Sequence, residues 1–113
     1  MEINIKIQDE NTDEILAEAM EAVSRASSGE TQWELDKRYG YHKAECAVSV
    51  KGILPVFRAL TEKYPKLNIF AMDSEEIRDD DRSAQWWRTT KITTERRPDG
   101  TTELKTDSAT YWA

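Results

Sequence analysis

The sequence predicts an α+β fold in which two helices cover one face of an antiparallel sheet. Three patterns predict it: short segments in which apolar and polar residues alternate, two longer segments with apolar residues at helical spacing, and two Thr-rich segments that flank a turn near the C-terminal end. With 113 residues, of which 38% are hydrophobic, the chain has material for one core. We therefore expect residues 1–113 to form a single α+β domain.

The first segments of the chain predict a strand followed by a helix. Isoleucines alternate with polar residues over residues 3–7, as in a strand with one buried face. Asn11 or Thr12 can cap the following helix, and the small residues 27–29 end it. This helix covers about residues 12–26, and its apolar residues fall on one side: Ile15, Leu16, Ala19, Met20 and Val23.

The middle of the chain predicts two strands joined by a turn. Apolar and charged residues alternate around Trp33 and Leu35, and the turn follows at residues 39–41. The second strand shows the same alternation over residues 44–50, with these apolar members: Ala44, Cys46, Val48 and Val50.

Residues 53–64 carry apolar side chains at helical spacing and predict the second helix. Pro55 would lie in its first turn, where a proline is tolerated, and Pro65 ends it. Residues 67–72 are apolar on both faces, which is typical of an interior strand. Residues 73–83 are dominated by charge and predict a loop.

Residues 85–113 predict a β-hairpin. Pro98-Asp99-Gly100 suits a type I turn followed by a left-handed glycine, because proline presets φ and glycine enters positive φ without strain. If Arg97 pairs with Thr101, the cross-strand pairs include Trp86 with Trp112, Ile92 with Thr106, and Thr94 with Leu104.

This register divides the aromatic residues of the hairpin between its two faces. We expect Trp86 and Trp112 to lie in the core, on the face that also carries Ile92. Trp87 and Tyr111 then lie on the opposite face, where they either pack under a loop or a neighbouring subunit, or anchor a partner.

The predicted order β-α-β-β-α-β, with a C-terminal β-hairpin extension, is that of a ferredoxin-like split β-α-β sandwich. Within it, three segments follow a recognisable pattern: Ala47-Val48-Ser49-Val50, then residues 53–60 with Pro55, then Lys63-Tyr64-Pro65-Lys66-Leu67. This stretch resembles small phage- and plasmid-encoded YubB-like ferredoxin-fold proteins. The resemblance implies the same fold and an origin in a mobile genetic element, and it implies no particular activity.

The chain is acidic, with a net charge of −6. It has no basic stripe, so the sequence does not favour nucleic-acid binding and indicates a protein partner of basic character. No run of 18 apolar residues occurs, so we expect no membrane association. Cys46 is the only cysteine and no secretory signal is evident at Met1, so we expect a cytoplasmic protein.

The strongest concentration of functional groups is acidic. It could hold Ca²⁺ or Mg²⁺, contact a basic partner, or be a solvated loop, although it lacks the glycine and glutamate positions of an EF-hand. The candidate partner-binding residues are therefore these carboxylates together with two aromatic residues: Asp73, Glu75, Glu76, Asp79, Asp80, Asp81, Trp87 and Tyr111.

The residues usually found in catalysis give no constellation. His42 is the sole histidine and is interpreted as a surface residue, while Cys46 falls in an apolar register, where a thiol acts as a small hydrophobe. The four glycines are scattered and form no phosphate loop, and no Cys or His pair has metal spacing. We therefore expect no cofactor, no metal and no catalytic residues.

Three hypotheses for function remain. The first is a non-enzymatic cytoplasmic protein-binding or modulator protein, which acts through the acidic segment and the aromatic side of the hairpin. The second is a small metal-dependent or acid/base enzyme that uses the loop carboxylates. The third is a self-associating structural protein, a homo-oligomer in which the outer hairpin strand pairs with its copy across a two-fold axis.

Overall fold

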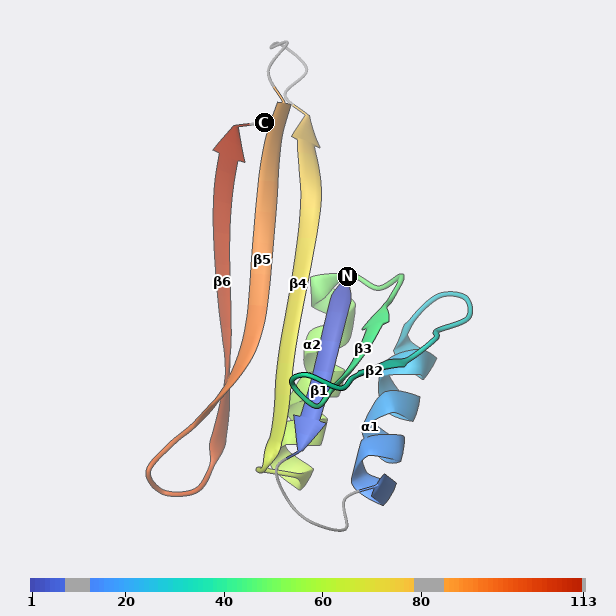
Figure 1. The fold of residues 1–113 in the computed structure, drawn as a ribbon. Coiled ribbons are helices and arrows are strands. Elements are labelled where there is room, and N and C mark those ends of the chain that lie inside the picture. Colours follow the sequence, from blue (N-terminus) through green and yellow to red (C-terminus); the bar gives the residue numbers. More distant parts are fainter. Residues whose placement is uncertain (8–12, 79–84, 113) are drawn as a thin grey trace.

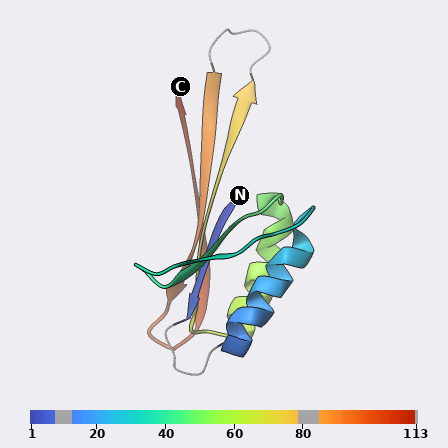
Figure 2. The same ribbon diagram turned by 45° about the vertical axis from the view of Figure 1, so that its right-hand side comes forward.

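The computed structural model describes residues 1–7, 13–78 and 85–112. Six strands form one antiparallel sheet in the order β2-β3-β1-β4-β5-β6, and two helices lie on the same face of it (Figures 1 and 2). The α+β prediction is confirmed. The elements are β1 (Glu2–Ile7), α1 (Asp13–Ala26), β2 (Glu34–Asp36), β3 (Tyr41–Glu45), α2 (Val50–Lys63), β4 (Leu67–Arg78), β5 (Gln85–Arg96) and β6 (Thr102–Trp112).

The core lies between the two helices and the middle of the sheet. In α1, Ala19 and Val23 are buried, and acidic residues in the first turn together with Arg25 in the last turn complement the helix dipole. Because apolar residues of α2 and of alternate strand positions meet them there, one continuous cluster forms. Its fully buried large side chains are Phe57, Ile3, Ile5, Ile53, Leu67, Ile69, Ile92 and Val23.

Helix α2 begins earlier than the sequence predicted. The Ser49 hydroxyl accepts a hydrogen bond from the Gly52 N–H at 3.0 Å, so the serine caps a helix whose first residue is Val50. The predicted strand over residues 44–50 is therefore wrong beyond Glu45. Pro55 also lies in the interior of α2 instead of its first turn, and its ring removes an N–H that would otherwise bond to the carbonyl one turn earlier.

Strand β1 is the centre of the sheet core. It pairs antiparallel with β3 on one side and with β4 on the other, where Ile3 lies opposite Ala71 and Ile5 opposite Ile69. Strand β4 is interior over this stretch, as predicted, and its residues Leu67, Ile69 and Ala71 are buried.

The predicted loop at residues 73–83 is wrong in its first half. Strand β4 continues to Arg78 and pairs with β5 along that whole length. The carboxylates are tolerated there because they lie beyond the core, and one of them, Glu75, pairs with Arg88 of β5 at 3.1 Å. Residues 79–83 lie outside the described part of the chain.

The predicted hairpin register is confirmed. Trp86 lies opposite Trp112, Ile92 opposite Thr106, and Thr94 opposite Leu104. The turn closes as expected: the Arg97 N–H donates to the Thr101 carbonyl at 2.8 Å, and Gly100 has a φ of 88°.

Three strands extend well past the rest of the fold. Strand β1 ends its pairing where Glu2 lies opposite Met72, so β4 beyond Met72 has β5 as its only strand neighbour among the described residues. We call the part of the sheet beyond this point the arm: residues 73–78, 85–90 and 108–112. Figure 2 shows it rising past the ends of both helices, and the molecule measures 54 × 35 × 27 Å.

Candidate functional site

The arm places its aromatic residues on two opposite faces. Trp86 lies opposite Ile77, on the face of the sheet that bears the helices further down. Trp87 lies opposite Glu76 and Tyr111, on the other face. Ile77, Trp86 and Trp87 are all half-buried.

The prediction that Trp86 belongs to the core is wrong. On its strand, the last residues that the core buries are Ile92 and Thr90, and Trp86 lies four residues further along the arm. The predicted face of the sheet for Trp86 was correct, but the helices that cover this face end before they reach that part of the strand (Figure 1). The backbones of Tyr111 and Trp112 pair as predicted, and their side chains lie outside the described part of the structure.

In the arm, the described residues of the predicted acidic cluster lie on opposite faces of the sheet. Asp73 and Glu75 lie on the helix-bearing face, whereas Glu76 lies on the opposite face, because successive residues of a strand point to opposite sides. Asp79, Asp80 and Asp81 lie outside the described residues. Within the described ranges no three acidic, His or Cys residues are placed to hold a metal ion.

A polar cavity of about 350 Å³ lies where the arm meets the start of α2. Both of its carboxylates lie near a positive charge: Glu75 pairs with Arg88 at 3.1 Å, and Asp73 lies 3.8 Å from the N-terminal ammonium of Met1. Thr90 and Ser108 share a hydrogen bond of 3.1 Å across the strands. These pairings brace the base of the arm.

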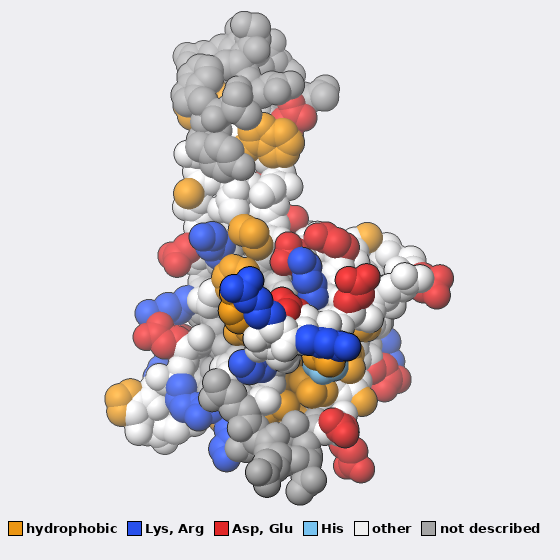
Figure 3. Space-filling view, viewed as in Figure 1, with side chains coloured by type: hydrophobic (Ala, Val, Ile, Leu, Met, Phe, Trp, Pro, Cys, Tyr) orange, Lys and Arg blue, Asp and Glu red, His pale blue; other side chains and the backbone are white. Residues whose placement is uncertain are grey.

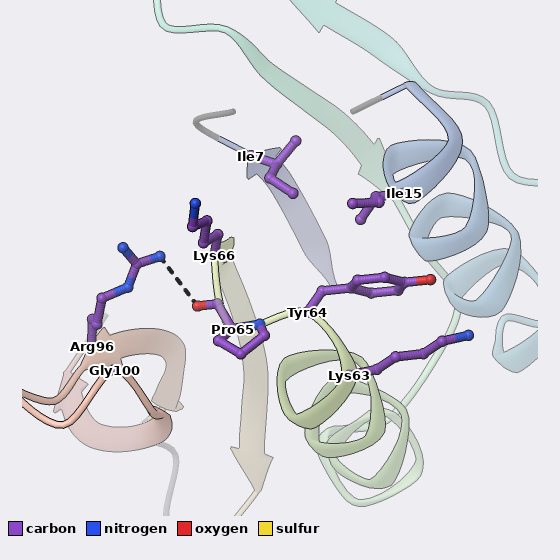
Figure 4. A pocket seen from close by; sticks show the side chains of 8 residues that line it. All are labelled: Ile7, Ile15, Lys63, Tyr64, Pro65, Lys66, Arg96 and Gly100. Carbon is purple, nitrogen blue, oxygen red and sulfur yellow. Dashed lines mark hydrogen bonds between the residues drawn. The ribbon is translucent and has the colours of Figure 1, made fainter. Parts of the chain in front are cut away.

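A second cavity of about 410 Å³ lies at the other end of the molecule (Figure 4). Figure 4 shows Ile7, Ile15 and Tyr64 around it, with Lys63, Lys66 and Arg96 at its margin. Arg96 donates to the Pro65 carbonyl at 3.3 Å. No sequence pattern signals this pocket, because its lining comes from several separate elements and turns: Ile7, Ile15, Lys63, Tyr64, Pro65, Lys66, Arg96 and Gly100.

The groups beside this second cavity are arranged for structure. The Glu18 carboxylate of α1 accepts hydrogen bonds from Lys63 at 2.6 Å and from the Tyr64 hydroxyl. Glu18 raises the pKa of Lys63, which keeps its ammonium group protonated and unsuited to act as a base or a nucleophile. The three groups join the two helices.

The stability of the protein should depend on the ionisation of Glu18. Hydrogen bonds from Lys63 and then from Tyr64 lower the pKa of Glu18 below its ordinary 4.5. A carboxyl group whose pKa is lowered by folding stabilises the protein above its unfolded-state pKa, and this contribution is lost as the pH falls through the folded-state value. We expect the free energy of unfolding to decline below pH 4.5 and the Glu18→Gln variant to decline less steeply.

Urea titrations at a series of acidic pH values measure this slope. Tyr64→Phe is a graded control, since it removes the hydroxyl donor and keeps the Lys63 contact, so its slope should lie between those of the wild type and Glu18→Gln. Identical slopes for all three proteins would contradict the role given to Glu18.

The remaining candidate residues have structural environments. His42 lies in β3, opposite Ile5 and Leu35, and is half-buried, so part of its side chain reaches the surface as predicted. Cys46 is 3% exposed, and burial raises the pKa of its thiol, which disfavours the reactive thiolate. The interpretation of Cys46 as a small buried hydrophobe is confirmed.

Comparison with known proteins adds no relative. No family model, no curated protein and no solved structure matches the chain. The resemblance to YubB-like proteins therefore stays a prediction. Among the residues described, neither helix has the length and apolar character needed to cross a membrane.

Proposed function

We propose that this chain is a non-enzymatic protein-binding protein whose contact surface is the arm. The observation that carries the proposal is that three strands continue past both helices and carry Ile77, Trp86 and Trp87 with them (Figure 2). A short ribbon without helical cover buries little of its own surface, whereas large aromatic side chains are the residues that most often dominate protein interfaces.

The distribution of charge over the surface supports the same assignment. Figure 3 shows basic and acidic side chains interleaved over the lower part of the molecule, whereas the arm shows few charges and some hydrophobic side chains. On the face of the arm that carries Trp87, Glu76 lies directly opposite it, and the residues on the side toward the body are uncharged: Ser74, Thr89 and Ala109. Interface centres are similarly depleted of charge and enriched in aromatic residues.

Two side chains that could act as nucleophiles are held in their unreactive forms. The Cys46 thiol is buried with a raised pKa, and Glu18 holds Lys63 in its protonated form. Both groups are thereby kept in the state that does not attack a substrate.

We also propose that β1 to β4 and the two helices form a ferredoxin-like split β-α-β unit, to which β5 and β6 add the extension. The pairing of β1 with both β3 and β4 supports this, because each helix then connects two strands that have another strand between them. In this view the arm projects beyond the split β-α-β unit, as a surface with a separate binding role would.

Site-specific photocrosslinking in the native cells tests the proposed function. We expect a benzoylphenylalanine that replaces Trp87 to form covalent adducts with protein on irradiation. The matched control replaces Tyr39, an aromatic residue that is 57% exposed in the β2–β3 turn, far from the arm. Adducts at position 87 should exceed those at position 39 several-fold, and equal yields at both positions would overturn the proposal.

A further inference from the structure

Strand β6 is a long and regular edge of the sheet. It has 11 residues, lies at the end of the strand order and pairs with β5 without a bulge from Thr102 to Trp112. It contains no proline or glycine. Such an edge offers a row of unpaired backbone donors and acceptors to another strand.

The other edges of the described sheet are protected against such pairing. Strand β2, at the far edge, has only three residues. The part of β4 that extends beyond β1 carries three carboxylates, Asp73, Glu75 and Glu76, which would repel a copy of themselves. In natural proteins, edge strands that are short or that carry repelling charges usually prevent strand addition. Strand β6 is long, and its charges are not arranged to repel a second copy.

The hydrogen bonds of the hairpin determine which groups of β6 point outward. The Arg97 N–H bonds to the Thr101 carbonyl, and hydrogen-bonded and non-hydrogen-bonded pairs alternate from there along an antiparallel ladder. The odd-numbered residues of β6 therefore bond to β5. The even-numbered residues direct their backbone N–H and C=O groups away from the sheet: Thr102, Leu104, Thr106, Ser108 and Thr110.

We propose that the partner of this edge is a second copy of the chain, which pairs antiparallel with β6 across a two-fold axis at Thr106. The proposal rests on the proposed function and names the partner. In this register Lys105 lies opposite Asp107 of the partner subunit, and the symmetry repeats the contact with the roles exchanged. Residues 102–110 of both copies would be paired.

The charges of β6 select this register among the alternatives. A pairing centred on Lys105 would place that lysine against its own copy, and one centred on Asp107 would do the same with the aspartate. A pairing centred on Leu104 also brings opposite charges together, but it pairs only residues 102–106. The pairing centred on Thr106 combines opposite charges with the longer contact.

The same arrangement continues features already present in one copy. Lys91 of β5 lies opposite Asp107, so Lys105 of the partner subunit would extend a row of alternating charges across the interface. The helix-bearing side of β6 is uncharged over residues 102–110, where Leu104 would face Ser108 of the partner subunit. No charge would therefore be buried on that side.

Pairing of this kind also supports the arm. Because the strands are antiparallel, Ser108 and Thr110 in the arm of one copy would bond to Leu104 of the partner subunit and Thr102 of the partner subunit. In each copy the end of β6 that carries Thr102 and Leu104 lies next to the body of the fold, where α2 contacts β6. The two sheets would join into one, with all helices on the same face.

Charge exchange tests the proposed interface. Sedimentation equilibrium should give twice the chain mass of 13.1 kDa for the wild type at sufficient concentration. Asp107→Lys places two lysines opposite each other at both symmetric contacts, so we expect dimerisation to weaken by about tenfold. The double variant Lys105→Asp/Asp107→Lys should restore it, because the opposite charges meet again with their positions exchanged.

The single and double variants share the Asp107→Lys substitution opposite Lys91. Lys105 also pairs with Glu95 within one copy, so the Lys105→Asp single variant is the control for the loss of that ion pair, and the coupling between the two substitutions reports on the contact between copies. Circular dichroism of all these variants shows whether the fold is kept. Failure of the double variant to regain affinity over the Asp107→Lys single variant would overturn the proposed register.

Disulfide formation tests the position of the two-fold axis independently. In the Thr106→Cys variant the new cysteines would face each other about 5.5 Å apart between Cα atoms, within disulfide range. Thr110→Cys is the matched control, since it is also exposed and on the same face of β6, but faces Thr102 of the partner subunit. Mild oxidation should link only the first variant covalently, and equal linkage of both would contradict the register.

The outcomes separate this inference from the proposed function. If the wild type is a monomer at every concentration while position 87 crosslinks to another protein, the second copy is not the partner and the proposed function still holds. If the wild type is a monomer and position 87 forms no adducts, both proposals fall. A dimer that responds to charge exchange as expected supports this inference, whereas the proposed function is still decided by the adducts at position 87.

Discussion

Replacement of Phe57 with alanine should lower the free energy of unfolding by about 3–5 kcal/mol. Phe57 is the largest fully buried side chain, and it projects from α2 into the cluster formed with α1 and the sheet. Its truncation removes aromatic surface from the core and leaves a cavity that the rigid sheet below cannot fill. Because small domains are stable by only about 5–15 kcal/mol, the variant should be close to unfolding.

Urea denaturation followed by circular dichroism measures this loss. The control is Arg58→Ala, at the next position of α2, where the side chain is exposed and a change within about 0.5 kcal/mol is expected. Comparable losses in the two variants would show that Phe57 does not occupy the centre of the core.

Ile92→Ala should have the second largest effect, a loss of about 2–5 kcal/mol. Ile92 is 1% exposed in β5, where it lies opposite Ala71 and Thr106. It is the fully buried residue that the hairpin contributes to the core cluster, just below the base of the arm. Its truncation should therefore loosen the hairpin as well as reduce the stability of the whole chain.

Thermal denaturation measures the global loss, and the crosslinking yield at position 87 reports on the arm at a temperature where the variant is folded. Lys91→Ala is the matched control, because Lys91 is the exposed neighbour of Ile92 and points to the other face of β5. If Ile92→Ala is as stable as Lys91→Ala, the hairpin is not anchored in the way described.

The features that sequence reasoning predicted correctly are those with local causes. The hairpin register follows from one turn, since the chemistry of Pro98-Asp99-Gly100 fixes which residues pair across all eleven positions. Helix α1 was also predicted to within a residue, because its apolar periodicity and its end signals agree.

The features that were predicted incorrectly depend on the rest of the chain. Strand β4 carries Asp73, Glu75 and Glu76 in extended structure because β5 supplies a complete hydrogen-bonding partner there, which outweighs the weak strand preference of acidic residues. Trp86 falls in the apolar register of its strand, yet it lies outside the core because the helices do not reach that far. The alternation of apolar and polar residues predicts on which face of the sheet a side chain lies, but it does not show which element covers that face.

The candidate surface was only partly visible in the sequence. Trp87 was chosen correctly as a residue on the face away from Ile92, but the arm itself depends on the difference in length between β1 and its neighbour β4. The free edge of β6 is likewise a property of the strand order, which no local pattern encodes. The carboxylates of residues 73–76 lie on the part of β4 that β1 leaves without a strand neighbour.

Amide hydrogen exchange along β6 tests the central claim most directly. In the Asp107→Lys variant, at a concentration at which it is monomeric, the amides of Glu103 and Lys105 should be protected by β5, whereas those of Leu104 and Thr106 should exchange quickly. In the wild type at concentrations that favour the dimer, the amides of Leu104 and Thr106 should become protected as well. Rapid exchange at Leu104 and Thr106 in the wild type at every concentration would contradict the account.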